Sequence, residues 1–175
     1  MSEKKPLVRT EPELVRARYP SGVPNGALVI APYDDEFFPA IKWFAKEGGE
    51  DYHGLAFLAP IGEHKHPVSI VSDEGEYVAV IQSLWRFNIQ VDSKAISQPS
   101  SHERIQCGLA LGDNKMYLRL PLAVPGRALL QPQFIDLSSG VAPHPGPSER
   151  GLIFFAEWEL LLGNSEDPVA CWPLK

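Results

Sequence analysis

Hydrophobic and polar residues alternate most clearly over residues 77–91, YVAVIQSLWRFNIQV. The odd-numbered positions are mostly apolar, with Ser83 as the single polar interruption, and the even-numbered positions become polar from Arg86 onward. This period of two predicts one long β-strand whose odd-numbered face lies against the core. Because the segment exceeds the usual strand length, we expect a bend or bulge near Gln82–Ser83.

Other apolar runs predict shorter strands. Residues 26–32 (GALVIAP) and 53–60 (HGLAFLAP) are apolar runs of strand length, and the first is bounded by Asn-Gly and Pro. Residues 106–124 predict a β-hairpin, because Gly112–Lys115 supplies turn residues between two apolar runs. These patterns together indicate a sheet with several strands.

A helix is predicted after the first of these strands, within the segment YDDEFFPAIKWFAKEGG. Its apolar positions are spaced by four, three and one residues, as on one face of a helix, and two carboxylates precede them at the positive N-terminal end. Pro39 would lie in the first turn, where its missing amide costs least. The residues concerned are Asp34, Asp35, Phe37, Ile41, Phe44 and Ala45, and Gly48 or Gly49 would end the helix.

Two more segments complete the prediction of secondary structure. Thr10 and Glu13 have the spacing of a capping box, which predicts a short helix that extends to about Arg18. Residues 151–163 fit a helix or a strand. We favour a strand, because the two glutamates that flank Trp158 share one side only in a strand.

The length and composition indicate one globular unit. At 175 residues with 44% hydrophobic content, the chain can bury one sizeable core. We expect a single domain over residues 1–175, whose first nine residues could be flexible. The predicted fold class is α+β, an antiparallel or mixed β-sheet with one or two helices packed on a face.

Charge is distributed unevenly along the chain. The net charge is −6, and residues 31–80 contain ten acidic but only three basic residues. Nucleic-acid binding is disfavoured, because it needs clustered Lys and Arg against the phosphates. No segment has the length and hydropathy of a membrane span or a signal peptide, so we expect a cytoplasmic protein without membrane contact. In that compartment Cys107 and Cys171 are expected to be free thiols.

Three histidines are the candidate metal ligands. His64 and His66 are two residues apart and would share a face of a strand, and His53 or a carboxylate could complete a transition-metal site. Residues 62–67 also fit a solvated loop between strands, and Lys65 disfavours a second cation there. We favour the loop, and therefore expect neither a metal nor another cofactor.

Motifs for nucleophilic or phosphate chemistry are weak or missing. The sequence has no G-x-S-x-G, no P-loop and no G-x-G-x-x-G. Ser101 and His102 are adjacent, but catalytic triads are assembled from distant segments. Asp34–Glu36 could bind Mg²⁺ or act as an acid and base, although helix capping explains it more simply. Cys107 has a strand-like apolar context and is expected in the core.

The function predicted from these observations is non-catalytic binding of a protein partner with a basic surface. In size and acidic composition, though in no motif, the chain resembles bacterial immunity proteins, and that resemblance implies a cognate toxin whose active site is occluded. The alternatives are a metal-dependent enzyme that uses His53, His64 and His66, or an accessory or scaffolding domain; the oligomeric state stays open. Partner-binding candidates are the carboxylates that helix capping leaves unexplained, namely Glu50, Asp51, Asp73, Glu74 and Glu76.

Overall fold

The computed structural model describes residues 13–72, 77–89, 96–97, 107–123 and 132–173. Over this part of the chain the regular structure consists of β-strands and one short 3₁₀ helix, η1 (Glu149–Gly151). The strands are β1 (Leu14–Arg18), β2 (Leu28–Tyr33), β3 (Glu36–Glu47), β4 (Glu50–Phe57), β5 (Ser69–Val71), β6 (Tyr77–Ile81), β7 (Trp85–Ile89), β8 (Ile96–Ser97), β9 (Gly108–Gly112), β10 (Lys115–Ala123), β11 (Pro132–Asp136), β12 (Ile153–Phe155), β13 (Trp158–Leu162) and β14 (Ala170–Trp172). The α+β prediction is therefore wrong.

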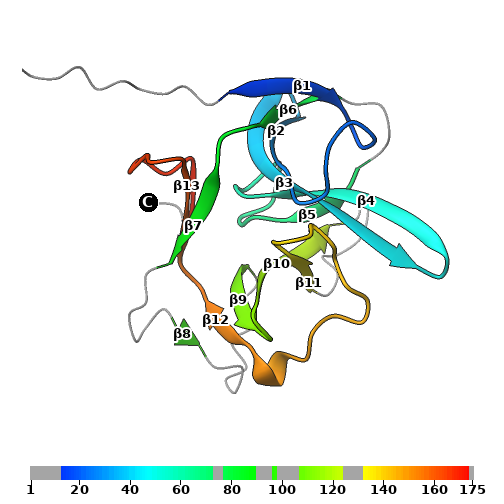
Figure 1. Ribbon diagram of the computed structural model, residues 1–175, viewed down its shortest axis with the longest axis vertical. Coiled ribbons are helices and arrows are strands. Elements are labelled where there is room, and N and C mark those ends of the chain that lie inside the picture. The colour runs from blue at the N-terminus through cyan, green and yellow to red at the C-terminus, as the bar shows by residue number, and fades with distance from the viewer. Residues whose placement is uncertain (1–12, 73–76, 90–95, 98–106, 124–131, 174–175) are drawn as a thin grey trace, which may run out of the picture.

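The strands form two sheets (Figure 1). The large sheet has the order β1-β6-β2-β3-β4-β5-β10-β9-β12-β8, and β11 pairs with β10 off this path. Its neighbouring strands are antiparallel except for β5 and β10, which run parallel. The small sheet has the order β14-β13-β7.

Strands β1 to β6 curve around a common apolar interior, at the upper right of Figure 1. Alternate residues of these strands point inward, as the strand period requires. The inward side chains include Ala17, Val29, Ala40, Phe57, Ile70 and Val80. Strands β1 to β6 thus supply most of one core, to which Ala123 of β10 also contributes.

A second and larger core lies on the outer side of β2, β3 and β4. Leu28, Ile41 and Trp43 pack there against residues of β9, β10 and the small sheet, such as Leu118 and Trp158. A small third cluster forms between side chains of β9 to β12 and the residue before β12, namely Ala110, Tyr117, Phe134, Leu152 and Phe154. The central strands of the large sheet therefore have both faces covered.

The segment predicted as a helix over residues 34–47 is strand β3. Because β3 is central and covered on both sides, consecutive residues Ala40–Trp43 are all buried and the period of two is lost. The apolar spacing that resembles a helical face is a consequence of this double burial. The two aspartates do not cap a helix but form the hairpin turn before the strand.

The second predicted helix is also a strand. Leu14–Arg18 is β1, which pairs antiparallel with β6. Thr10, whose side chain was expected to cap the helix, lies outside the described residues. Propensity gave the wrong answer here because the pairing with β6 supplies backbone hydrogen bonds that the local sequence does not reveal.

The predicted strands are present, with two changes of connectivity. Residues 77–89 contain two strands, β6 and β7, which belong to different sheets. The first strand ends next to Gln82–Ser83, where a bend was expected. The prediction of one strand with its odd-numbered face in the core is therefore wrong for β6, where Val78 and Val80 are buried and Tyr77 is exposed, whereas the odd-numbered residues of β7 do pack against the large core. Residues 151–163 likewise divide into β12 and β13. The hairpin of β9 and β10 is confirmed, with Asp113 and Asn114 as its turn.

Candidate functional site

A two-residue turn joins β2 to β3 and exposes three consecutive carboxylates. Tyr33 pairs with Glu36, which leaves Asp34 and Asp35 as the loop. Both aspartates have positive φ, 46° and 66°, as the two central residues of a type I′ hairpin turn require. The side chains of Asp34, Asp35 and Glu36 are exposed to solvent.

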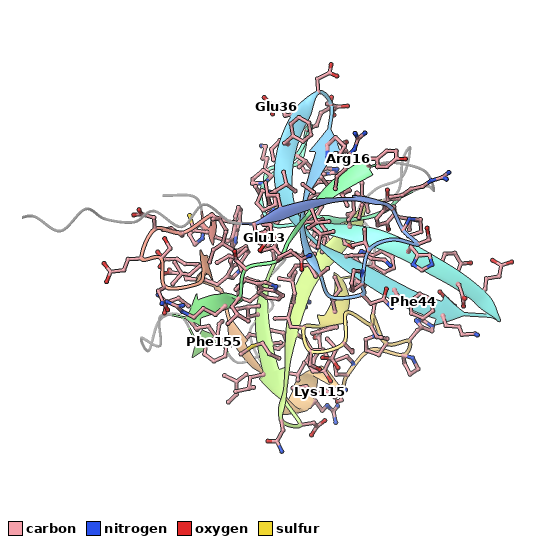
Figure 2. All side chains as sticks on the ribbon, turned by 45° about the horizontal axis from the view of Figure 1, so that its top comes forward. Glu13, Arg16, Glu36, Phe44, Lys115 and Phe155 are labelled. Atoms are coloured by element: carbon pink, nitrogen blue, oxygen red, sulfur yellow. The ribbon has the colours of Figure 1, made fainter. Side chains whose placement is uncertain are left out.

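An exposed aromatic ring lies directly beside these carboxylates. Phe37 is 71% exposed, whereas the neighbouring Phe38 packs edge-on against Phe57 with ring centroids 6.3 Å apart. Tyr33 also contacts Phe57 edge-on, at 5.8 Å. The base of the hairpin is therefore fixed to the core, while its tip, marked by Glu36 in Figure 2, projects into solvent. We call Asp34–Phe37 the hairpin tip.

No ion pair involves the carboxylates of the hairpin tip within the described residues. The other acidic turn, between β3 and β4, differs in this respect. Its Asp51 lies 3.7 Å from Lys46, and its Glu50 accepts a 2.9 Å hydrogen bond from the Tyr52 hydroxyl. The second turn thus satisfies part of its charge internally.

The two acidic turns lie at opposite ends of one strand. Glu36 is the first residue of β3 and Glu47 is its last. Of the predicted partner-binding residues, Glu50 and Asp51 are exposed at the β3–β4 turn. Asp73, Glu74 and Glu76 lie outside the described residues. The sequence predicted charge in this segment, but not that the two turns lie at opposite ends of β3.

No protein-family model, curated protein or solved structure matches this chain. Among the described residues, no helix is long and apolar enough to cross a membrane.

The three candidate histidines are placed on two elements. His53 lies in β4, with its ring 5.3 Å from that of Phe44. His64 and His66 lie in the connection between β4 and β5, as the loop interpretation predicted. No group of three or more His, Cys, Asp or Glu side chains suited to hold a metal ion is found within the described ranges.

The two cysteines are free thiols. Cys107 is 4% exposed and contributes to the large core, as predicted. Burial raises the pKa of the Cys107 thiol to about 12, although the charge of Arg119 opposes the shift. A thiol with this pKa is not a nucleophile near neutral pH. The neighbouring Ser101 and His102 lie outside the described residues.

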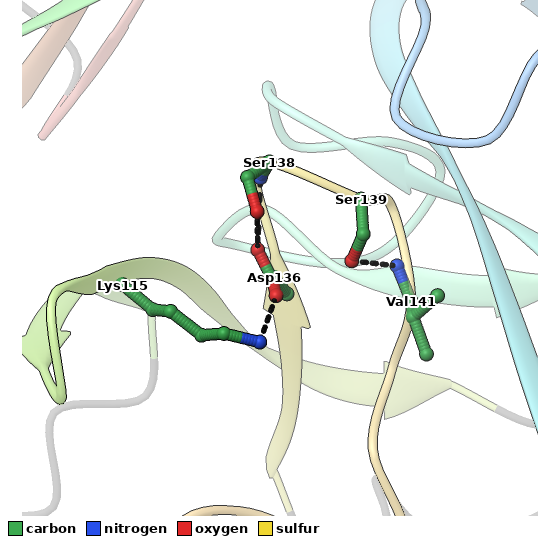
Figure 3. A network of polar contacts seen from close by, with 5 residues as sticks. All are labelled: Lys115, Asp136, Ser138, Ser139 and Val141. Carbon is green, nitrogen blue, oxygen red and sulfur yellow. Dashed lines mark hydrogen bonds and ion pairs between the residues drawn. The ribbon is translucent and has the colours of Figure 1, made fainter.

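A polar network that the sequence did not predict lies at the end of β11, beside the start of β10 (Figure 3). Asp136 accepts hydrogen bonds from Lys115 Nζ at 2.7 Å, from Ser138 Oγ at 2.6 Å and from Ser138 N at 2.9 Å. Burial alone raises the pKa of Asp136, but these hydrogen bonds and the lysine charge outweigh it and lower the pKa to about 2. The network holds a turn and offers no free group for chemistry.

Two buried cations were also missed. Lys42 is 4% exposed and donates to the carbonyl oxygens of Pro20 at 2.9 Å and Val23 at 2.6 Å, which fastens the loop before β2 to β3. Arg119 is 5% exposed and lies close to two aromatic rings of the third cluster, those of Phe134 and Phe154. The sequence feature that could have indicated both buried cations is a single charged residue between apolar residues of a strand, as in IKW and LRL.

Proposed function

We propose that this protein is a non-catalytic binding protein that docks a partner with a basic surface through its hairpin tip. The observation that carries the proposal is the 71% exposure of Phe37 beside three carboxylates that have no ion-pair partner in the described part of the chain. An aromatic ring anchors an interface by burying apolar area, while the carboxylates attract and orient a cationic partner.

The choice of turn residues supports this assignment. A type I′ turn prefers Asn-Gly, because both residues need positive φ and glycine has no Cβ to strain. Here two aspartates occupy the turn; aspartate tolerates positive φ less well than glycine does, and the two adjacent carboxylates also repel each other. Residues that cost stability at an exposed position are most simply explained by a role in recognition.

The partner is a protein surface with clustered Lys and Arg and a shallow apolar contact for Phe37. Inhibition of a cognate toxin, as in immunity proteins, is one form of such binding and stays a prediction. A scaffolding role would use the same surface without inhibition. The metal-dependent enzyme stays an untested alternative that no observation on the described residues favours.

The test uses a double variant that keeps the hairpin but removes its turn charges. D34N/D35G introduces the preferred type I′ residues, so we expect a fold at least as stable as the wild type. The matched control is D113N/N114G in the β9–β10 turn, where the wild-type residues also have positive φ. Wild-type and variant proteins would be immobilised, and proteins from the cell extract retained at low salt identified by mass spectrometry.

The proposal expects a basic protein that is retained by the wild type and by the control but lost from D34N/D35G and from F37S. Its association rate with the wild type should fall as salt rises, since screening shortens the reach of the carboxylates. Equal recovery with all four proteins would refute the hairpin tip as the docking site. Recovery of an enzyme whose activity is blocked would separate inhibition from scaffolding.

A further inference from the structure

The Arg119 guanidinium is buried with most of its hydrogen-bonding capacity unused. Its side chain is 6% exposed, and it donates from Nη2 to Glu149 Oε1 at 3.2 Å. Within the described part of the protein, Nε and Nη1 are buried without an acceptor. A guanidinium carries five N–H donors, and a buried charge with unmet donors is costly. An anion with free oxygen atoms would accept these unused hydrogen bonds and offset the buried charge.

Two aromatic rings lie close to the Arg119 guanidinium. Its Cζ lies 5.7 Å from the Phe134 ring centroid and 5.6 Å from that of Phe154. On the adjacent strand β9 its register partner is Gly108, which has no side chain to contribute. The rings stabilise the cation through their faces but cannot accept its in-plane hydrogen bonds.

Glu149 is placed to compete with an incoming anion. It is the first residue of η1, a single turn in the segment connecting β11 to β12, and its side chain is 49% exposed. An oxyanion binds arginine bidentately across two neighbouring nitrogens. Both bidentate edges of a guanidinium include Nη2, which is the nitrogen that Glu149 contacts. Nη2 carries two hydrogens, one for each edge, so the edge that shares a hydrogen with Glu149 accepts a bidentate anion only when Glu149 moves aside.

We infer that Arg119 forms a binding subsite for a carboxylate or phosphate group, and that Glu149 is a tethered anion that this group displaces. The site lies on β10, separate from the hairpin tip, and does not depend on the proposed protein partner. Because Glu149 is half exposed on a one-turn helix, its displacement breaks one charged contact and leaves the sheet intact.

The test uses E149Q, which removes the competing charge from a surface position and is expected to fold. Its control is E166Q, at an exposed glutamate in the β13–β14 connection. Sodium phosphate and sodium acetate would be titrated against sodium chloride at matched ionic strength. Binding would be followed by the NMR signal of the Arg119 Nε–H group and by the melting temperature.

We expect E149Q to bind phosphate or acetate at least about tenfold more tightly than the wild type does, because the competing Glu149 carboxylate is lost. The control E166Q should bind as the wild type does. The stronger of the two probes distinguishes a phosphate site from a carboxylate site. R119K in the E149Q background should abolish the gain, because lysine cannot make the bidentate contact. If E149Q and E166Q respond equally to every anion and the Arg119 signal does not move, Arg119 is structural and the inference is wrong.

Discussion

Gly140 packs directly against the backbone of Gly26, so that two loops far apart in the sequence meet beside β3. A Cβ atom placed on Gly140 would lie 1.9 Å from Gly26 N, and the φ of Gly140 is +68°. The same two loops are hydrogen-bonded to β3, since Gly26 N donates to Lys42 O at 2.8 Å and Phe44 N donates to Gly140 O at 2.9 Å. The contact thus fixes the loop after β11 against the loop before β2 and against β3.

Substitution of Gly140 by Ala should therefore destabilise the protein in two ways: alanine is strained at this positive φ, and its Cβ would clash with the backbone of Gly26. Gly48 is a suitable control, because its φ of +61° is similar but its added Cβ would meet no atom within 4 Å. We expect G48A to cost about 1 kcal/mol and G140A on the order of 3 kcal/mol or more. Denaturant unfolding of both variants measures the difference, and equal midpoints would show that the two loops do not touch.

The β9–β10 hairpin could be predicted from the sequence, but the β2–β3 hairpin and the coverage of the sheets could not. The turn at Asp113–Asn114 was recognised because both residues tolerate positive φ and apolar runs flank them. The turn at Asp34–Asp35 has the same chemistry, yet the next strand is buried on both faces and lacks the alternation that identifies a strand. Burial on two faces is a property of the whole sheet, which local patterns do not contain.

The candidate site was predicted in part. Acidic charge in the central segment is visible in composition, and the loop position of His64 and His66 follows from their polar neighbours. The exposure of Phe37 could not be predicted, because an aromatic residue next to buried ones is normally assigned to the core. Arg119 and Glu149 are thirty positions apart, and only the pairing of β10 with β9 and β11 brings their surroundings together.

Acid should destabilise the protein through Asp136. Its pKa of about 2 in the folded state lies below the ordinary value of 3.8, so the folded state favours the charged form. The resulting stability is present above about pH 4 and is lost as the pH falls toward 2. D136N should lower the melting temperature at neutral pH and flatten its decline in acid, whereas D167N at an exposed position should change neither. Parallel acid profiles for the wild type and D136N would contradict the role of the network.

Lys42 should contribute to stability through the loop that it holds. Replacing it by Met keeps the buried hydrocarbon but leaves the carbonyls of Pro20 and Val23 without their donor. We expect a loss of about 1–3 kcal/mol for K42M, and within about 0.5 kcal/mol of zero for K46M, whose ion pair with Asp51 is exposed. Urea unfolding of both variants provides the measurement. A more stable K42M would show that the desolvation of the ammonium group outweighs its two hydrogen bonds.

Burial lowers the pKa of the Lys42 ammonium. Between that lowered value and the ordinary value of 10.5, the unfolded chain binds more protons than the folded one, so this residue makes stability rise with pH. The free energy of unfolding of the wild type relative to K42M should accordingly increase as the solution is made alkaline. Measurements at several pH values below 10 would check the sign, and a shrinking difference would mean that the folded state retains the proton more strongly than the unfolded chain does.

The small sheet should depend on Trp158 more than on the neighbouring aromatic residues of β7. Trp158 is 2% exposed, and its ring meets that of Phe87 edge-on with centroids 5.4 Å apart. W158A removes a fully buried large side chain and should cost on the order of 3–5 kcal/mol. Trp85 is only partly buried, so W85A should cost less, and R86A at an exposed position should cost about 0.5 kcal/mol or less. Unfolding midpoints in the order W158A, W85A, R86A, from lowest to highest, are expected.

A midpoint for R86A below that of W85A would place the other face of β7 against the core and would show that the register of β7 with β13 is wrong.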